Sequence, residues 1–200
     1  MPQPRSERRE QILQTLVVML EENASSKITT ARLAERVGVS EAALYRHFAS
    51  KTKMFEALIE FAEDTLFTRV RQISEEGSSA LIACERMLAL FLGFCERNPG
   101  IARILHGEAL ANEEPRLHLR VSQIYDRLET QLRTTLRQAE NHESLRPQLV
   151  LNDAATLLMA AAEGRLSQFI RSQFKRSPLT GWPEQWAVLT GGFMREVPTQ

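Results

Sequence analysis

Residues 33–48 read Leu33-Ala34-Glu35-Arg36-Val37-Gly38-Val39-Ser40-Glu41-Ala42-Ala43-Leu44-Tyr45-Arg46-His47-Phe48, and this stretch decides the fold. Two short helices that pack closely need a small residue midway along the first, a glycine at the turn where φ is positive, and apolar residues between them. Ala34 is the small residue, Gly38 is the turn, and the apolar positions are Leu33, Val37, Val39 and Leu44. The stretch therefore predicts a helix-turn-helix.

The second helix of this motif is expected to expose one face. Ser40 is placed to cap it, and Leu44 and Phe48, four residues apart, are expected to point inward. An exposed helix with small residues near its start can enter the major groove of DNA. The alternative is an ordinary helical hairpin in a core, which the polar outward positions disfavour. Those positions are Glu41, Ala42, Ala43, Tyr45, Arg46 and His47.

The flanking turns add candidate contacts to the DNA backbone. Ser50 is expected to cap a helix whose first turn carries Lys51 and Lys53, where the helix dipole disfavours a cation by about 0.3–1 kcal/mol. A docked phosphate would reverse that sign, although a solvated helix end remains the alternative. Thr29 and Thr30 offer hydroxyls from the start of the preceding helix. The expected DNA-binding set is Thr29, Thr30, Ser40, Glu41, Ala42, Ala43, Tyr45, Arg46, His47 and Lys51.

The charge of the chain is unevenly divided. The 200 residues carry 25 Lys and Arg and 25 Asp and Glu. Residues 1–53 hold nine of the bases and six of the acids, a net charge of +3, which leaves −3 for the rest. This modest asymmetry suggests a head that faces a polyanion. Arg5, Arg8 and Arg9 could form an arm toward the DNA backbone or minor groove, or a solvated charged terminus.

Several classes of protein are disfavoured by composition. The longest apolar run, residues 87–95, is about half of the ~18 to 20 residues that cross a bilayer, and the first residues lack an apolar segment, so we expect a cytoplasmic protein without a membrane partner. Cys84 and Cys95 are expected to be reduced core residues, with no metal site. No catalytic motif or nucleotide fingerprint is visible, so neither an enzyme nor a cofactor is expected. The four histidines without a shared motif are His47, His106, His118 and His142.

Helical periodicity runs through the whole chain and predicts an all-α fold without strands. Asn98 is expected to cap a short helix that has Pro99 at its first position. We expect a helix-turn-helix head over residues 1–53 and a helical body for partner binding and dimerisation over residues 54–200. The expected helices span residues 6–22, 30–37, 41–48, 50–74, 80–97, 99–107, 115–139, 151–174 and 183–195.

The head resembles the TetR family of DNA-binding regulators. The resemblance is carried by residues 28–34, 38–48, and Ser50 with Lys51. It implies a three-helix head on a larger body, about nine helices in all, a homodimer built on the last two long helices, and a palindromic double-stranded DNA site. The operator and the number of dimers on each site are left open.

The penultimate expected helix supports the implied dimer. Its apolar residues, with Ala154 among them, would overload a single inward stripe, and its small residues allow close helix approach. A buried core within one monomer is the alternative. The expected dimer contacts are Leu157, Leu158, Ala161, Leu166, Phe169 and Ile170.

Segments of the body resemble one branch of the TetR family, the nucleoid occlusion factors. They are residues 54–61, 92–100 and 163–175. The resemblance implies a nucleoid-associated protein that, when bound to DNA, antagonises assembly of the FtsZ division ring over the chromosome by binding the C-terminal tail of FtsZ. A ligand-responsive TetR-type transcriptional repressor is the alternative function.

Spacing allows a peptide site in this body. Leu90, Gly93 and Arg97 share one helix side, where Gly93 would leave room for an incoming backbone, and Phe61 and Arg69 are about 80° apart around their own helix. Apolar residues flanked by arginine suit a peptide with apolar and acidic side chains. A helical core with a packing notch at Gly93 is the alternative. By resemblance, the positions that hold the FtsZ tail are Phe61, Arg69, Leu90, Gly93, Arg97 and Asn98.

Overall fold

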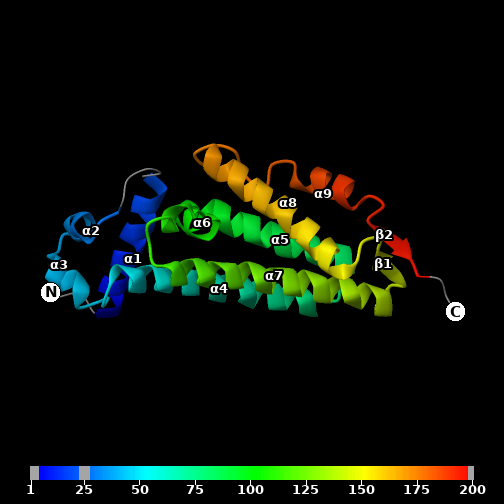
Figure 1. Cartoon of the computed structure of the whole chain (residues 1–200), viewed down its shortest axis with the longest axis horizontal. Coiled ribbons are helices and arrows are strands. Elements are labelled where there is room, and N and C mark those ends of the chain that lie inside the picture. The colour runs from blue at the N-terminus through cyan, green and yellow to red at the C-terminus, as the bar shows by residue number, and fades with distance from the viewer. Residues whose placement is uncertain (1–4, 23–27, 198–200) are drawn as a thin grey trace. The chain divides into compact units, whose positions relative to one another are not determined.

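The computed structural model describes residues 5–22 and 28–197, and it is helical nearly throughout (Figure 1). The expected all-α fold class is confirmed. Within the described residues there are nine α-helices, a short 3₁₀ helix and two short strands. In chain order they are α1 Arg5–Glu22, α2 Thr30–Val37, α3 Glu41–Tyr45, α4 Lys51–Glu75, α5 Ala80–Arg97, α6 Pro99–His106, η1 Glu108–Leu110, α7 Pro115–His142, β1 Leu145–Pro147, α8 Leu151–Arg171, α9 Trp182–Thr190 and β2 Met194–Glu196.

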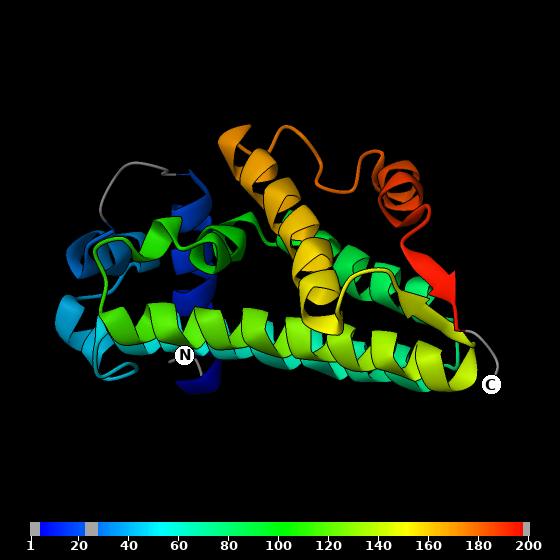
Figure 2. The same ribbon diagram turned by 45° about the vertical axis from the view of Figure 1, so that its right-hand side comes forward.

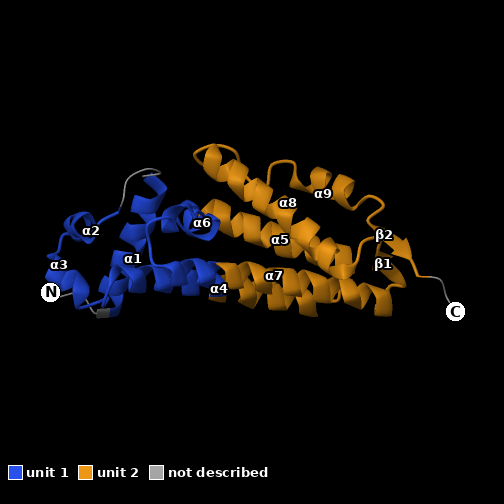
Figure 3. Cartoon of the chain, in the orientation of Figure 1, with its two compact units in different colours: residues 1–63, 98–121 blue, residues 64–97, 122–200 orange. Residues whose placement is uncertain are grey.

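The chain forms two compact units, which are coloured separately in Figure 3. Unit 1 comprises residues 1–63 and 98–121, and unit 2 comprises residues 64–97 and 122–200. The division by packing therefore falls inside α4 and α7. The functional boundary between head and body, expected after residue 53, stays a prediction.

Unit 1 packs α6 closely across α1. Gly100 lies at the crossing, where a Cβ on this residue would stand 3.0 Å from the carbonyl carbon of Val17 and nearer still to its oxygen. A backbone atom cannot move aside as a flexible side chain can, so the crossing requires glycine. Pro99 starts α6, as expected. Asn98 stands at the N-cap position, as expected, but its side chain makes no capping hydrogen bond.

Unit 2 is a helical bundle around α5, with α8 and α9 packed on it (Figure 2). The guanidinium of Arg127 on α7 lies 3.8 Å from the ring centre of Phe67 on α4, and Gln131 donates to Ser74 at 3.0 Å. These parts of α4 and α7 therefore run side by side in the same direction. Cys84 and Cys95 are buried and free, and burial raises the pKa of the Cys84 thiol to about 12.

The sequence predicted no strands, but six residues form two short strands, so this prediction is wrong there. β1 and β2 pair antiparallel, with Arg146 opposite Arg195, in the segments expected to be a loop and the end of the last helix. That helix stops at Thr190 because Gly191 and Gly192 follow, and Gly192 has φ of 76°. Strands of three residues are too short to show an alternating pattern, so periodicity could not find them.

The helix expected to reach Phe174 ends at Arg171. Gln173 and Phe174 adopt left-handed backbone, with φ of 52° and 63°. The N–H of Phe174 donates to the carbonyl of Phe169 at 3.0 Å, and the two rings lie 5.0 Å apart. This is the usual bond pattern and apolar contact of a helix end, made here without glycine.

Candidate nucleic-acid interface and partner groove

The turn between α2 and α3 is built from local backbone signals. Thr29 caps α2 by accepting from the N–H of Arg32 at 3.3 Å, and Ser40 caps α3 by accepting from Ala43 at 3.2 Å. Between them Gly38 has φ of 78°, and its N–H donates to the carbonyl of Glu35 at 3.1 Å. Only a residue that tolerates positive φ can make this turn, and so the expected helix-turn-helix is confirmed.

The second helix of the motif is shorter than expected. α3 ends at Tyr45 rather than Phe48, and the chain continues in a tighter turn, in which the N–H of His47 donates to the carbonyl of Leu44, three residues back, at 3.0 Å. Leu44 and Phe48 are buried, as expected. Of the positions expected to face outward, four are exposed, namely Glu41, Ala42, Tyr45 and Arg46, whereas Ala43 and His47 are only half-buried. Whether they contact DNA stays a prediction.

A polar network joins the start of α2 to the outer face of α3. The hydroxyl of Thr30 donates to the Glu41 carboxylate at 2.6 Å, and the phenol of Tyr45 donates to the same hydroxyl at 3.4 Å. Three residues expected to touch DNA therefore hold one another in place. This arrangement limits the rotamers of Glu41 before any ligand arrives.

Arg9 supports this surface from behind rather than extending from it. Its guanidinium donates to the carbonyl of His47 at 2.6 Å and lies 4.1 Å from the ring centre of Phe48. Arg8 donates to Gln11 one turn along at 2.8 Å. Helix α1 already includes both residues, so the suggested arm is wrong for them, and the side chain of Arg5 lies outside the described residues.

The lysines at the start of α4 have protein partners. Lys51 forms an ion pair with Glu113, with side-chain exposures of 19% and 12%. Lys53 pairs with Glu56 at 2.6 Å, and this hydrogen bond lowers the pKa of the Glu56 carboxyl. Ser50 caps the helix as expected, accepting from the Lys53 N–H at 3.2 Å. Carboxylates of the chain itself thus compensate these two cations at the start of the helix.

A groove of about 760 Å³ opens on unit 1, and no residue of α2 or α3 lines it. Phe61 on α4 is 51% exposed there, and Asn98 lies in the same lining. These are two of the six residues expected to hold a peptide, and the structure brings them together. The rest of the lining comes from three helices: Glu10, Leu13, Gln14, Val17, Val18, Leu58 and Ile101.

The contribution of α1 to this groove was not expected. Leu13 and Val17 are only half-buried, and Val18 beside them is exposed. The signal was present in the width of the apolar arc. Val17 and Val18 extend it beyond the face that one packed neighbour can cover.

The other four expected peptide residues lie in unit 2. Arg69 is exposed and donates to Gln72 at 3.2 Å, and Leu90 is half-buried. Gly93 is buried, and a Cβ on it would meet the guanidinium of Arg97 and the side chain of Leu179, each at 3.5 Å. The room above Gly93 therefore holds side chains of the chain itself, which is the packing-notch alternative, and Arg97 lies directly against it.

The residues expected at a dimer interface divide into two groups. Leu158, Leu166, Phe169 and Ile170 are buried within the single chain, so they belong to its own core. Leu157 is exposed and Ala161 is half-buried. Only the latter pair is available to a second copy without repacking, and the interface itself stays a prediction.

Neither a membrane span nor a metal cluster is found in the described residues. No described helix has the length and apolar character that crossing a bilayer demands. Within residues 5–22 and 28–197, no three His, Cys, Asp or Glu side chains are grouped so that they could hold a metal ion. His118 lies 2.9 Å from the carbonyl of Leu110, which is a structural contact.

Both parts of the chain match known protein families. Residues 12–58 match the bacterial regulatory proteins of the tetR family, and residues 78–193 match the tetracyclin repressor-like C-terminal domain. Solved structures agree on the fold. The MbdR regulator from Azoarcus sp. CIB superposes with a TM-score of 0.78 at 20% identity, over 92% of this chain and 98% of that one. FadR from Bacillus subtilis in complex with stearoyl-CoA gives 0.72 at 15%, over the same shares.

Curated relatives are far more similar in sequence. Nucleoid occlusion factor SlmA from Marinomonas sp. (strain MWYL1) is 49% identical over 97% of this chain and 98% of its own length. SlmA from Shewanella woodyi is 50% identical over 93% and 94%. DNA binding and dimerisation follow from membership of such a family, whose members are not enzymes. The chain belongs to the TetR family and, within it, to the family of the nucleoid occlusion factor SlmA.

Proposed function

We propose that this chain, bound to DNA as a homodimer, antagonises assembly of the FtsZ ring over the chromosome by holding the C-terminal tail of FtsZ. It acts on the nucleoid in the cytoplasm, at a palindromic site. The observation that carries the proposal is the groove of unit 1, which presents Phe61 and Asn98 on a surface separate from the outer face of α3.

The outer face of α3 has the chemistry to read a major groove. Glu41, fixed by Thr30, is an acceptor suited to the amino group of cytosine, and Ala42 is small enough to lie against a thymine methyl group. Arg46 and Tyr45 are suited to guanine and phosphate respectively. Because Lys51 is paired with Glu113, a phosphate contact from Lys51 would share or replace that carboxylate.

The groove has the chemistry to hold a short peptide. Its lining is mostly apolar, while Asn98 supplies an amide that can bond a peptide backbone. Phe61 stands exposed among aliphatic neighbours and is the natural anchor. By resemblance, Arg69, Leu90, Gly93 and Arg97 of unit 2 are also expected to hold the FtsZ tail, although side chains of the chain itself occupy the room above Gly93.

The test is binding of a fluorescent FtsZ tail peptide to the full chain, with and without a DNA site that the protein has selected from a random library. Phe61→Ala should weaken peptide binding about tenfold or more by removing a buried aromatic contact. DNA affinity should stay unchanged. Leu119→Ala is the matched control, because Leu119 is also in unit 1, is 65% exposed and does not line the groove.

The outcome also separates the two candidate functions. Absence of tail binding with and without DNA would overturn the proposal and favour the ligand-responsive repressor. In that case a small molecule should release the DNA. Retained tail binding in Phe61→Ala would instead overturn the assignment of the groove.

A further inference from the structure

The two strands of unit 2 bring like charges together. Arg146 on β1 and Arg195 on β2 are directly opposite in an antiparallel pair, so their side chains leave the ladder on the same face. Like charges at such positions destabilise the pair. An anion bound between the two guanidiniums would offset this repulsion.

Both arginines line a hollow of about 380 Å³. The Nε atom of Arg146 is buried and has no hydrogen-bond partner. In the part of the chain that the structure describes, neither guanidinium has an ion pair or a hydrogen bond, although Glu140 lines the same hollow. The oxygen of Asn152, another lining atom, already accepts from Arg133 at 3.2 Å. The donors of the arginine pair are thus available.

One part of the rim of the hollow is apolar, beside the polar Gln148 and Asn152. Leu149 and Val150 line it, and Val150 is 68% exposed at the start of α8. A ligand with only a charged group would leave these side chains in water. A ligand with an oxyanion and a short apolar part would satisfy the guanidiniums and cover the rim together.

We propose that the hollow between Arg146, Arg195 and Leu149–Leu151 is a binding site for a small oxyanion, carboxylate or phosphate, that carries a short apolar tail. The guanidiniums hold the oxyanion, the rim residues cover the tail, and bridging by the anion turns the cross-strand repulsion into attraction. The site lies within unit 2 and is independent of DNA and of the peptide groove.

The test is calorimetric titration of the full chain at constant ionic strength. The probes are octanoate and octyl phosphate, which distinguish the two sources of oxyanion, with acetate, inorganic phosphate and octanol as the separate parts. Saturable binding of octanoate or octyl phosphate, tighter than that of any part, is expected. Arg146→Gln and Arg195→Gln should each weaken it by about tenfold, as loss of a charge-assisted contact predicts.

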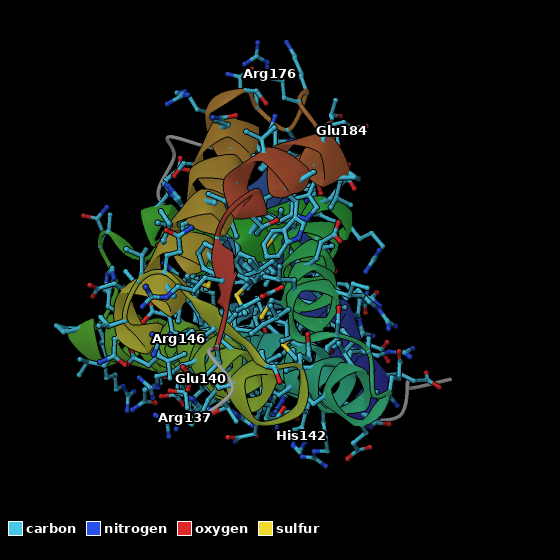
Figure 4. All side chains as sticks on the ribbon, turned by 90° about the vertical axis from the view of Figure 1, so that its right-hand side faces the viewer. Arg137, Glu140, His142, Arg146, Arg176 and Glu184 are labelled. Atoms are coloured by element: carbon cyan, nitrogen blue, oxygen red, sulfur yellow. The ribbon has the colours of Figure 1, made fainter. Side chains whose placement is uncertain are left out.

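Two further variants sharpen the test. Glu140→Gln should tighten binding, because it removes a negative charge beside the anion. Arg176→Gln is the matched control, since Arg176 is an exposed arginine of unit 2 that lies apart from Arg146 and Glu140 in Figure 4. No saturable binding of either probe, or equal binding by the control and the two site variants, would overturn the proposal.

Thermal melting without ligand separates this role from a structural one. Arg195→Gln should melt at the same temperature as the parent chain or higher, because the like-charged pair is gone. A lower melting temperature would show that Arg195 stabilises the fold by itself and would overturn the proposal.

Discussion

The α3 face and the groove of unit 1 are built in opposite ways. The outer face of α3, together with the start of α2 beside it, is polar and comes from one continuous stretch, residues 29–47. Within it, Thr30 is hydrogen-bonded to both Glu41 and Tyr45. The groove is apolar, and its lining comes from α1, α4, Asn98 and α6. The first surface is shaped by caps and a turn, whereas the second exists only after distant helices have packed. A change in packing should therefore damage the groove before it damages the α3 face.

The largest expected effect comes from Gly100→Ala. The added methyl group meets the backbone of Val17, so α1 and α6 must move apart, at a cost of about 3 kcal/mol. Tail-peptide binding should be lost, and the melting temperature should fall by roughly 6–12 °C in differential scanning calorimetry. Leu119→Ala is the control, because Leu119 is an exposed residue of unit 1 that does not line the groove. Equal melting of the two variants would show that the crossing does not hold the groove.

A second change should act on the α3 face alone. Thr30→Val removes the hydroxyl that joins Glu41 to Tyr45, which frees the Glu41 carboxylate to rotate. DNA affinity should fall about tenfold and base preference should relax, because a directional contact is no longer fixed. Library selection of DNA sites followed by titration measures both. Thr134→Val, which removes an exposed hydroxyl from α7, should change neither. If Thr30→Val without DNA no longer bound the tail peptide, the claim that the two surfaces are independent would be contradicted.

Lys51 tests a position that is paired within the fold and is also proposed to contact DNA. Lys51→Met leaves Glu113 without its partner in a largely buried place, which should cost about 1–2 kcal/mol of unfolding free energy. Adding Glu113→Gln should restore stability. If Lys51 also contacts phosphate, the double variant should still bind DNA more weakly, with a salt slope smaller by about one. Full recovery of DNA affinity in the double variant would reduce Lys51 to a structural residue.

The smallest expected effect is a pH dependence of stability that arises from Glu56 near the start of α4. The same helix contains Phe61 of the groove. The hydrogen bond from Lys53 lowers the pKa of Glu56 below its ordinary value of 4.5. A carboxyl with a lowered pKa stabilises the fold above its ordinary pKa, and this contribution is lost as pH falls through the lowered value. At pH 7 the free energy of unfolding of Glu56→Gln should therefore be lower than that of the parent by roughly the 0.2–1 kcal/mol of a surface pair. Its melting temperature should be slightly lower as well. A difference that persisted at pH 2 to 3 would assign it to packing instead.

The limits of sequence-based prediction follow the same contrast. Thr29, Gly38 and Ser40 act within four residues of themselves, so the helix-turn-helix and its outward face could be derived from the sequence alone. Lys51 pairs with Glu113, which is 62 residues away, and Arg9 donates to His47, which is 38 residues away. No local sequence pattern predicts partners at such a distance. The sequence therefore allowed either a phosphate contact or a solvated side chain for Lys51 and Arg9, whereas in the structure both have partners within the fold.

Burial was harder to derive than helicity. The apolar residues of α8 were too many for one stripe, which suggested a dimer face, but Leu158, Leu166 and Phe169 are covered within the chain. Periodicity gives the direction of a side chain and not the number of neighbours around its helix. The strands at residues 145–147 and 194–196 were missed for a related reason, since their pairing joins segments about fifty residues apart.

Hydrogen exchange on the full chain measures the central claim, that one unit carries two separate surfaces. Selected DNA alone should protect backbone amides in residues 29–47. Adding the FtsZ tail peptide to that complex should protect residues 13–18 and 58–61 without loss of the DNA protection. Peptide protection confined to residues 29–47, or release of the DNA on peptide binding, would contradict the account.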